Sequence, residues 1–366
     1  MPEPAALGQA KLLWTLPFDA DWVTAVCFLG STRRLAAGNN LGQVLIWDLP
    51  EQPDAPPPLP RRRLDGHTNA ISRLVATADG RWLISASYDH TIRYWDTQAS
   101  PQGQETLTLN ARAREEAGRR GGKVPPAVEA TVNVQPATQV LRGHRDWVSD
   151  LALSRDEQLL LSGGDDGWVV LWDRPAAKEQ RRWQLPAWAY AVALSPDNRQ
   201  ALVSERRPLV FDSSRHAGVR LWDVTSGTVQ RDLSSDFKGI YISAADYSPD
   251  GKLLALGRGG EVDGFNGKVF LLDPASPGKP RELSPGHQYG ITDLAFHPDG
   301  RHLASSGRDT VVRLWDTAAA KVVQEIGKPR GSQFKDWIHA IAFSADGRWL
   351  ATADMAGAVQ VWAFSA

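Results

Sequence analysis

The dipeptide Trp-Asp recurs along the chain, and this repetition constrains the fold more than any other feature. The dipeptide begins at positions 47, 95, 172, 222 and 315, each time at the end of a short alternating run of apolar residues. Leu272-Asp273 and Trp362-Ala363 are degenerate copies, and the seven positions follow one another at spacings of 48, 77, 50, 50, 43 and 47 residues. Alternating apolar residues rich in Val and Ile indicate strands, and a recurrent spacing of this length indicates repeated units that stack on one another.

Each unit carries further strand and turn signals in a constant order. An apolar strand leads to a tight turn such as Ser248–Gly251, a second strand follows, and the Trp-Asp strand comes third. A fourth strand ends in Gly-His in three units, at Gly66-His67, Gly143-His144 and Gly286-His287. Four antiparallel strands in about 40 to 50 residues are typical of one β-propeller blade, so seven units predict seven blades.

Composition excludes several classes of protein. The chain of 366 residues has a formal net charge of −1, which excludes a globally basic nucleic-acid binder, and its single cysteine, Cys27, excludes an intrachain disulfide framework and a Cys-rich zinc site. No apolar run approaches the roughly 18 residues of a membrane span, and the N-terminus has no secretory signal, so we expect a cytoplasmic chain without membrane association. The amino-acid composition, rich in Ala, Arg, Gly and Pro, is typical of bacterial chains.

The pairing of Gly-His with Trp-Asp resembles the signature of the WD-repeat β-propeller family, and the resemblance covers roughly residues 11–366. It implies an all-β fold, a seven-bladed β-propeller of four-stranded antiparallel blades, in a single domain of residues 1–366. Residues 11–16 resemble the missing fourth strand of the last unit. We expect Leu12–Leu16 to pair beside the Trp362 strand and to close the ring, which hides two strand edges.

The resemblance also implies a buried hydrogen-bonded network of His, Ser or Thr, Asp and Trp in each complete blade. Because these residues recur once per unit, a structural role is favoured over a catalytic or metal-binding one. Gly164 and Gly307 occupy the expected serine position in the third and sixth units. The expected members are His67, Ser87, Asp89 and Trp95 in the second unit, His144, Asp166 and Trp172 in the third, and His287, Asp309 and Trp315 in the sixth.

Aromatic residues recur nine positions before the Asp of the first turn, where the chain enters the innermost strand. The resemblance places this position at the top rim, where rigid aromatics suit a partner-binding surface. The alternative is that each ring packs against a neighbouring loop. The candidate rim residues are Trp22, Trp147, Trp188, Tyr241, Tyr289 and Trp337, with Arg206 and Arg207 from a long loop of the fourth unit adding positive charge.

The one long spacing holds an insertion within residues 97–138. Its middle, residues 111–123, is charged and lacks apolar periodicity, so we expect it to be flexible. Its flanks alternate in polarity, which leaves a protruding β-ribbon as the alternative. The Pro-rich stretch Pro50–Pro60 precedes Arg61–Arg63 in the first unit. The family topology places both insertions on the bottom face, where they act either as a docking patch or as solvated linkers.

Motifs for catalysis are absent from the sequence. It contains no nucleophile elbow, zinc-protease helix or phosphate loop, and Cys27 lies in an apolar strand, which indicates an inert thiol. Asp150 and Asp293 share one strand position and are candidates to line the channel, where they would bind a cation or water. We therefore predict a non-catalytic scaffold without cofactor or metal, monomeric, with a protein or peptide partner rather than nucleic acid. The alternative is a small-ligand receptor or enzyme that uses the central channel.

Overall fold

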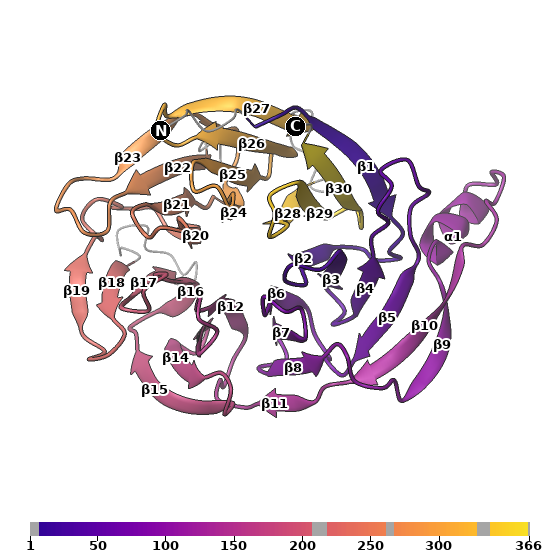
Figure 1. The fold of residues 1–366 in the computed structure, drawn as a ribbon, viewed down its shortest axis with the longest axis horizontal. Helices are drawn as coiled ribbons and strands as arrows, with labels where there is room; N and C mark the ends of the chain where they lie inside the picture. Colours follow the sequence, from indigo (N-terminus) through magenta and orange to yellow (C-terminus); the bar gives the residue numbers. More distant parts are fainter. Residues whose placement is uncertain (1–6, 207–217, 261–266, 328–336, 365–366) are drawn as a thin grey trace.

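Seven sheets surround a central axis, and each sheet corresponds to one of the predicted units (Figure 1). The structure is a computed structural model that describes residues 7–206, 218–260, 267–327 and 337–364. Six sheets have four strands and the first blade has six, so the predicted seven-bladed β-propeller is confirmed. None of the helices in these ranges is long and apolar enough to cross a membrane.

The first three blades contain the following strands, given from the axis outward. Blade 1 has β2 (Val23–Phe28), β3 (Arg34–Asn39), β4 (Val44–Asp48), β5 (Pro60–Asp65), β10 (Glu129–Pro136) and β9 (Gly103–Thr108). Blade 2 has β6 (Ile71–Ala76), β7 (Trp82–Ser87), β8 (Ile92–Asp96) and β11 (Gln139–Leu141). Blade 3 has β12 (Val148–Leu153), β13 (Leu159–Gly164), β14 (Trp168–Asp173) and β15 (Lys178–Gln184).

The other four blades follow the same order. Blade 4 has β16 (Trp188–Leu194), β17 (Gln200–Arg206), β18 (Val219–Asp223) and β19 (Val229–Asp232). Blade 5 has β20 (Ile242–Tyr247), β21 (Leu254–Arg258), β22 (Gly267–Leu272) and β23 (Arg281–His287). Blade 6 has β24 (Ile291–Phe296), β25 (His302–Gly307), β26 (Val311–Asp316) and β27 (Lys321–Gly327). Blade 7 has β28 (Ile338–Phe343), β29 (Trp349–Asp354), β30 (Val359–Phe364) and β1 (Ala10–Leu16).

The ring closes as the sequence predicts. Strand β1 pairs antiparallel with β30, with Leu12 opposite Trp362 and Leu16 opposite Val359. Trp14 of the same strand is 1% exposed and packs edge-on against Trp349, with ring centroids 6.0 Å apart. The first strand therefore both covers the edge of β30 and adds a large side chain to the core of the last blade.

The insertion differs from the prediction. Strands β9 and β10 form the expected antiparallel pair, but β10 adds in parallel to the outer edge of β5, so the ribbon extends blade 1 instead of protruding from the bottom face (Figure 1). Val132 is fully buried in the same apolar cluster as Trp47. The physical reason is that β5 presents an unpaired edge, and β10 both pairs with that edge and covers the apolar side of the blade.

The charged middle of the insertion includes the helix α1 (Ala111–Arg119), where we expected a flexible stretch. No residue of this helix is buried, so its stability depends on ion pairs between turns and on contacts at its start. Glu115 and Arg119 are paired at 2.6 Å, and Arg112 forms an ion pair with Asp21 in the segment that leads from β1 into β2. An apolar pattern therefore could not have revealed this helix.

Blades 2, 3 and 6 each contain a buried chain of four hydrogen-bonded side chains. In blade 2 the Trp95 indole N–H donates to the Ser85 hydroxyl at 2.8 Å, and that hydroxyl lies 2.7 Å from His67 Nε2. His67 Nδ1 lies 2.8 Å from Asp89. Equivalent chains are Trp172, Ser162, His144 and Asp166 in blade 3, and Trp315, Ser305, His287 and Asp309 in blade 6.

The serine of this network is Ser85, so the assignment of Ser87 was wrong. The side chains of Ser85 and Ser87 point to the same face of β7. Ser87 lies two residues nearer the end of the strand, and its hydroxyl donates to the carbonyl of Asn69. At the equivalent position blade 3 has Gly164, where a Cβ would lie 2.6 Å from His144 Nδ1.

Burial fixes the charge state of the network. It lowers the pKa of His67 and of His287, although hydrogen bonds to their aspartates oppose the shift. The neutral imidazole then donates from Nδ1 and accepts at Nε2, which matches the order of partners from Trp to Asp. Burial opposes ionisation of Asp309, but its interactions with His287, the Gln288 N–H and Arg313 together lower its pKa to about 2.

Candidate binding face at the channel mouth

The predicted rim aromatics lie where the inner strands begin, which defines one end of the channel as the rim face. Trp22, Trp147, Tyr241 and Trp337 immediately precede β2, β12, β20 and β28, and Trp188 is the first residue of β16. Tyr289 stands two residues before β24. The repeat position thus corresponds to one structural position in five blades, and blade 2 has Ala70 there.

The rim aromatics differ in exposure. Trp22 is 48% and Trp147 is 44% exposed, whereas Trp188, Tyr241, Tyr289 and Trp337 are half-buried. Leu41, in the turn between β3 and β4, is 61% exposed. Among the described rim residues, the most exposed apolar side chains therefore lie on blades 1 and 3, which flank the small Ala70 of blade 2.

In six blades a second residue belongs to the same rim. In the turn between the second and third strands, one backbone N–H donates to the carbonyl of the rim residue of the same blade. These bonds fix the turn against the entry of the inner strand. They join Asn40 to Trp22, Tyr88 to Ala70, Asp165 to Trp147, Gly259 to Tyr241, Arg308 to Gly290 and Met355 to Trp337 at 2.8–3.1 Å.

Two of these turn residues, Tyr88 and Arg308, contact the rim aromatic of the following blade through their side chains. Tyr88 stacks on Trp147, with ring centroids 4.5 Å apart and planes at 13°. The guanidinium of Arg308 lies 4.6 Å from the ring centroid of Trp337. Stacked aromatic and cation–π contacts of this kind orient the rim side chains before any partner arrives.

Blade 4 supplies a third contact of the same kind. The Arg206 guanidinium lies 5.0 Å from the ring centroid of Tyr241 in blade 5 and 4.8 Å from that of Tyr190 in its own blade. The two tyrosine rings meet edge to face at 5.6 Å. Arg206 thus lies at the predicted rim, while Arg207 falls outside the described residues.

Asp165 adds a carboxylate to the rim beside Trp147. The Ser149 hydroxyl donates a hydrogen bond to it, and burial raises the pKa of Asp165 above its ordinary value. The nearby carboxylates of Asp146 and Asp166 also favour its protonated form. The rim is therefore mixed in charge, with acidic groups near blade 3 and arginines on blades 4 and 6.

Below the rim an arginine crosses the channel. Arg73 of β6 forms ion pairs at 2.9 Å with Asp150 of the neighbouring blade and at 2.9 Å with Asp293 of blade 6. Burial opposes the charge on Arg73, but Asp293 and Asp150 hold its pKa above its ordinary value. The two aspartates line the channel as expected, and the cation between them is a side chain of the protein itself.

The same carboxylates join adjacent blades. Asp150 accepts the backbone N–H of Val192 at 2.9 Å, and Asp293 accepts that of Ile341 at 3.0 Å. Each bond runs from one inner strand to the next, so these aspartates serve ring assembly as well as the ion pairs with Arg73.

A cavity of about 350 Å³ begins at Arg73 and extends along the later residues of the inner strands, away from the rim. Its walls are mostly aliphatic, with Cys27 and Asp246 among them. Burial raises the pKa of Cys27 to about 12, which agrees with an inert thiol. Loss of surrounding water raises the pKa of Asp246 to about 7, although Arg73 opposes the shift.

Comparison with known proteins identifies the family. A family model described as "WD domain, G-beta repeat" matches residues 59–96, 136–173, 278–316 and 325–363. The small ribosomal subunit protein RACK1 of Brassica napus is 31% identical over 315 residues, which cover 66% of this chain and 93% of that protein. The chain belongs to the WD40-repeat family.

Two further WD40 relatives match over most of their length. RACK1 of Neurospora crassa is 24% identical over 327 residues, covering 84% of this chain and 97% of that protein. The guanine nucleotide-binding protein subunit beta of Oryza sativa subsp. japonica is 24% identical over 328 residues, covering 83% of each. These relatives come from a fungus and from plants, so they do not support the bacterial origin that the composition suggested.

Sequence reasoning missed several residues of the WD40 rim, among them Leu41, Tyr88 and Arg308. Tyr88 and Arg308 each stand one position before the Asp of a buried network. Aligning the repeats on that Asp would have identified the residue before it as a second rim position. Arg73 was missed because the side chain that pairs with Asp150 and Asp293 comes from another blade.

Proposed function

We propose that this WD40 chain is a non-catalytic scaffold that holds a protein or peptide partner on its rim face. The central contacts come from the rim of blades 1 to 3, which we define as Trp22, Leu41, Tyr88 and Trp147. The relatives support this class of function, since their names describe subunits of a ribosome and of a guanine nucleotide-binding protein.

The observation that carries the proposal is the exposure of two tryptophans on one part of a rigid ring. Trp22 and Trp147 keep 48% and 44% of their surface accessible, whereas four of the six tryptophans at the strand ends are buried and Trp222 and Trp362 are half-buried. Tryptophan and tyrosine offer large contact areas at a small cost in conformational entropy, and they dominate the energetics of protein interfaces. The stacking of Tyr88 on Trp147 reduces that cost further, because the ring is already held.

The test is a crosslinked capture of the partner from a lysate of the source organism, followed by affinity measurement with the purified partner. A Trp22→Ala/Trp147→Ala variant should lose at least about tenfold in affinity, because hot-spot truncations typically cost about 2 kcal/mol or more. Thermal melts of both proteins establish that the variant is folded.

The matched control changes apolar residues that are equally exposed but lie on outer strands. Val229 of β19 is 43% and Val323 of β27 is 49% exposed. A Val229→Ala/Val323→Ala variant should bind the partner like the wild-type protein. Loss of binding in this control, with binding kept in the rim variant, would contradict the proposal.

The central channel is the other route to a function, as a small-ligand site or an active site. Arg73 lies between the rim and the inner cavity, where it forms ion pairs with Asp150 and Asp293. A ligand that displaced the guanidinium would leave these two carboxylates without their cation, which is costly for largely buried groups. We therefore place the function on the rim and propose that the chain is not an enzyme and needs no cofactor.

The remaining features of the proposal follow from charge and from the relatives. A formal net charge of −1 gives no general attraction to phosphate backbones, so the partner is a protein or peptide and not a nucleic acid. We further propose that the chain works in the cytoplasm and is monomeric in the absence of its partner. Size-exclusion chromatography with light scattering tests the oligomeric state.

A further inference from the structure

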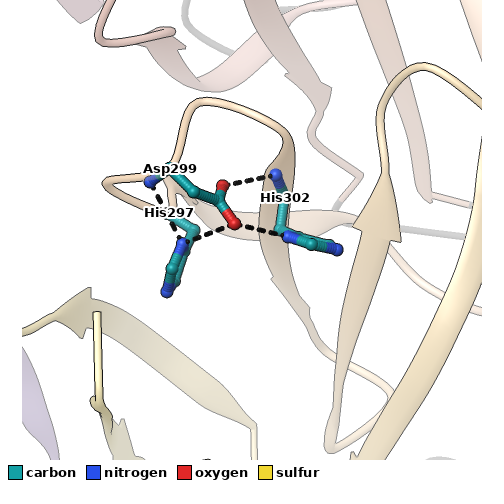
Figure 2. Close-up of side chains that lie close together, drawn as sticks. All are labelled: His297, Asp299 and His302. Carbon is teal, nitrogen blue, oxygen red and sulfur yellow. Dashed lines mark hydrogen bonds and ion pairs between the residues drawn. The ribbon is translucent and has the colours of Figure 1, made fainter. Parts of the chain in front are cut away.

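Two histidines and an aspartate meet in the turn between β24 and β25 of blade 6, at the end of the channel opposite the rim. His297, Asp299 and His302 place their ligand atoms within 4.8 Å of one another, and they form the one such group of three among the described residues (Figure 2). His297 and His302 are buried, at 9% and 2% exposure, whereas Asp299 faces solvent. The group is therefore formed by two buried imidazoles and is open to solvent on the side of Asp299.

The two oxygens of Asp299 have different partners. Oδ1 accepts the backbone N–H groups of Arg301 at 2.8 Å and of His302 at 3.0 Å, which closes the turn. Oδ2 faces the two imidazoles, 2.7 Å from His302 Nδ1 and 3.0 Å from His297 Nδ1. One carboxylate oxygen and two imidazole nitrogens therefore converge, as Figure 2 shows. Electron pairs that meet in this way repel one another unless a positive ion or a proton lies between them.

The tautomer of His297 is set by the neighbouring blade. Its Nε2 lies 3.0 Å from the carbonyl oxygen of Gly347, which can only accept, so this nitrogen carries the hydrogen. In the neutral ring the lone pair is then on Nδ1, directed at Asp299. A backbone carbonyl that holds the far nitrogen of a ligating histidine is a recurrent feature of metal sites. The backbone N–H of Asp299 also donates a hydrogen bond to His297 Nδ1, but the distance between the two nitrogens is long, at 3.2 Å.

The equivalent turns of the other blades show that neither histidine is needed for the fold. At the position of His297, four blades have a serine that donates to the turn aspartate at 2.6–2.7 Å, as Ser248 does to Asp250. At the position of His302, blades 3 and 5 have Leu159 and Leu253. The turn forms equally well in these blades, so the paired histidines of blade 6 are additional to the requirements of the turn.

We propose that His297, Asp299 and His302 form a binding site for a transition-metal dication of the zinc type. Two imidazole nitrogens and one carboxylate oxygen are ligands that Zn²⁺ prefers, whereas Ca²⁺ and Mg²⁺ require oxygen ligands. Bond lengths to Zn²⁺ are about 2.0–2.2 Å, so small side-chain rotations bring the three atoms around one ion. Solvent on the side of Asp299 supplies the remaining coordination.

The surroundings allow a cation to reach the site. A hollow of about 500 Å³ borders it and is lined by Asp299 together with Asp250, Arg155 and Arg301. The Arg301 guanidinium is already paired with Asp316, at 2.6 Å, which reduces its repulsion of an incoming ion. A metal bound here would link the turn of blade 6 to that of blade 7 through His297 and Gly347.

The test is a titration of the full-length, chelator-treated protein with Zn²⁺, followed by calorimetry. Co²⁺ serves as a spectroscopic probe of imidazole coordination. We expect binding of one ion per chain, with at least about tenfold weaker affinity in His302→Leu and in His297→Ser. Both substitutions introduce residues that sister blades already use at these positions, so the turn should be retained, and circular dichroism verifies it.

The matched control is His90→Asn, because His90 is exposed and lies outside the group. Its affinity for Zn²⁺ should equal that of the wild-type protein. The proposal is overturned if the wild-type protein binds no Zn²⁺, which would leave the histidines as hydrogen-bonding and ion-pairing groups of the turn. It is also overturned if the folded His302→Leu and His297→Ser variants bind with unchanged affinity, or if His90→Asn removes binding.

Discussion

The rings of Tyr88 and Trp147 stack across the boundary between blades 2 and 3, with centroids 4.5 Å apart and planes at 13°. Trp147 nevertheless keeps 44% of its surface accessible. One face of the indole is thus occupied by a neighbour while the remainder is available to a partner. A side chain held in this way loses little entropy on binding, which is the physical basis for assigning the binding function to this part of the rim.

The two classes of tryptophan should respond differently to truncation. Trp95→Ala removes a fully buried ring and leaves Ser85 without its donor, so we expect a loss of about 3–5 kcal/mol in the free energy of unfolding. Trp147→Ala removes a half-exposed ring and should cost about 1 kcal/mol or less. Urea denaturation of both variants measures the difference. Equal losses would mean that Trp147 is structural, which would weaken its assignment to a binding surface.

Replacing the arginine in the channel should destabilise the ring. Arg73→Leu leaves the carboxylates of Asp150 and Asp293 without their cation, and we expect a loss of about 3 kcal/mol, at the low end for buried pairs because the Arg73 side chain is 26% exposed. Adding Asp150→Asn and Asp293→Asn should restore part of the loss, since asparagine keeps an oxygen that accepts the backbone N–H groups. If the triple variant is less stable than Arg73→Leu alone, unpaired charge is not the cause.

Asp246 should make stability dependent on pH. In the folded protein burial raises its pKa to about 7 from an ordinary value of 3.8; among the charged groups nearby, Arg73 lowers the pKa and Asp293 raises it. The folded state therefore holds the proton more tightly than the unfolded chain, and its stability falls as the pH rises from about 4 to 7. Asp246→Asn has no such penalty, so its advantage over the wild-type protein should be larger at pH 8 than at pH 5.

Urea denaturation of Asp246→Asn and the wild-type protein at these two pH values measures this effect. One pKa unit corresponds to about 1.4 kcal/mol, so even part of the expected shift is detectable. The asparagine retains an acceptor for the Phe296 N–H, which bonds the native carboxylate at 2.7 Å. A stability difference that is the same at both pH values would show that Asp246 is ionised at low pH in the folded protein.

Removal of the first strand should open the ring. Deleting residues 1–16 exposes the edge of β30 and removes the buried Trp14, so we expect a much lower melting temperature and aggregation that increases with protein concentration. Deleting residues 1–6, which precede β1, is the control and should leave the melting temperature near that of the wild-type protein. An unchanged melt after the longer deletion would refute closure by β1.

The repeat pattern was sufficient to predict the blades and the closure of the ring, because Trp-Asp strands and Asp-Gly turns are local signals. The network serine was misplaced because a strand offers two same-face positions two residues apart, and only the three-dimensional contact with Trp95 distinguishes Ser85 from Ser87. The insertion was misplaced for a related reason, since the pairing of β10 with β5 depends on a free edge elsewhere in the chain.

The rim was predicted only in part. The aromatic position of each repeat follows from spacing alone, so Trp22 and Trp147 could be named from the sequence. Their exposure could not, because it depends on what the preceding blade contributes, as Arg308 does at Trp337. The ion pairs of Arg73 join blades that are far apart in sequence, and no local pattern records such a contact.

The most direct test of the central claim is hydrogen–deuterium exchange of the chain with and without its captured partner. The proposed site predicts added protection at the turn containing Leu41, at Tyr88 and at the segment entering β12, with little change on the outer strands β19 and β27. Protection confined to those outer strands, or to the turns at the opposite end of the channel, would contradict a binding site on the rim of blades 1 to 3.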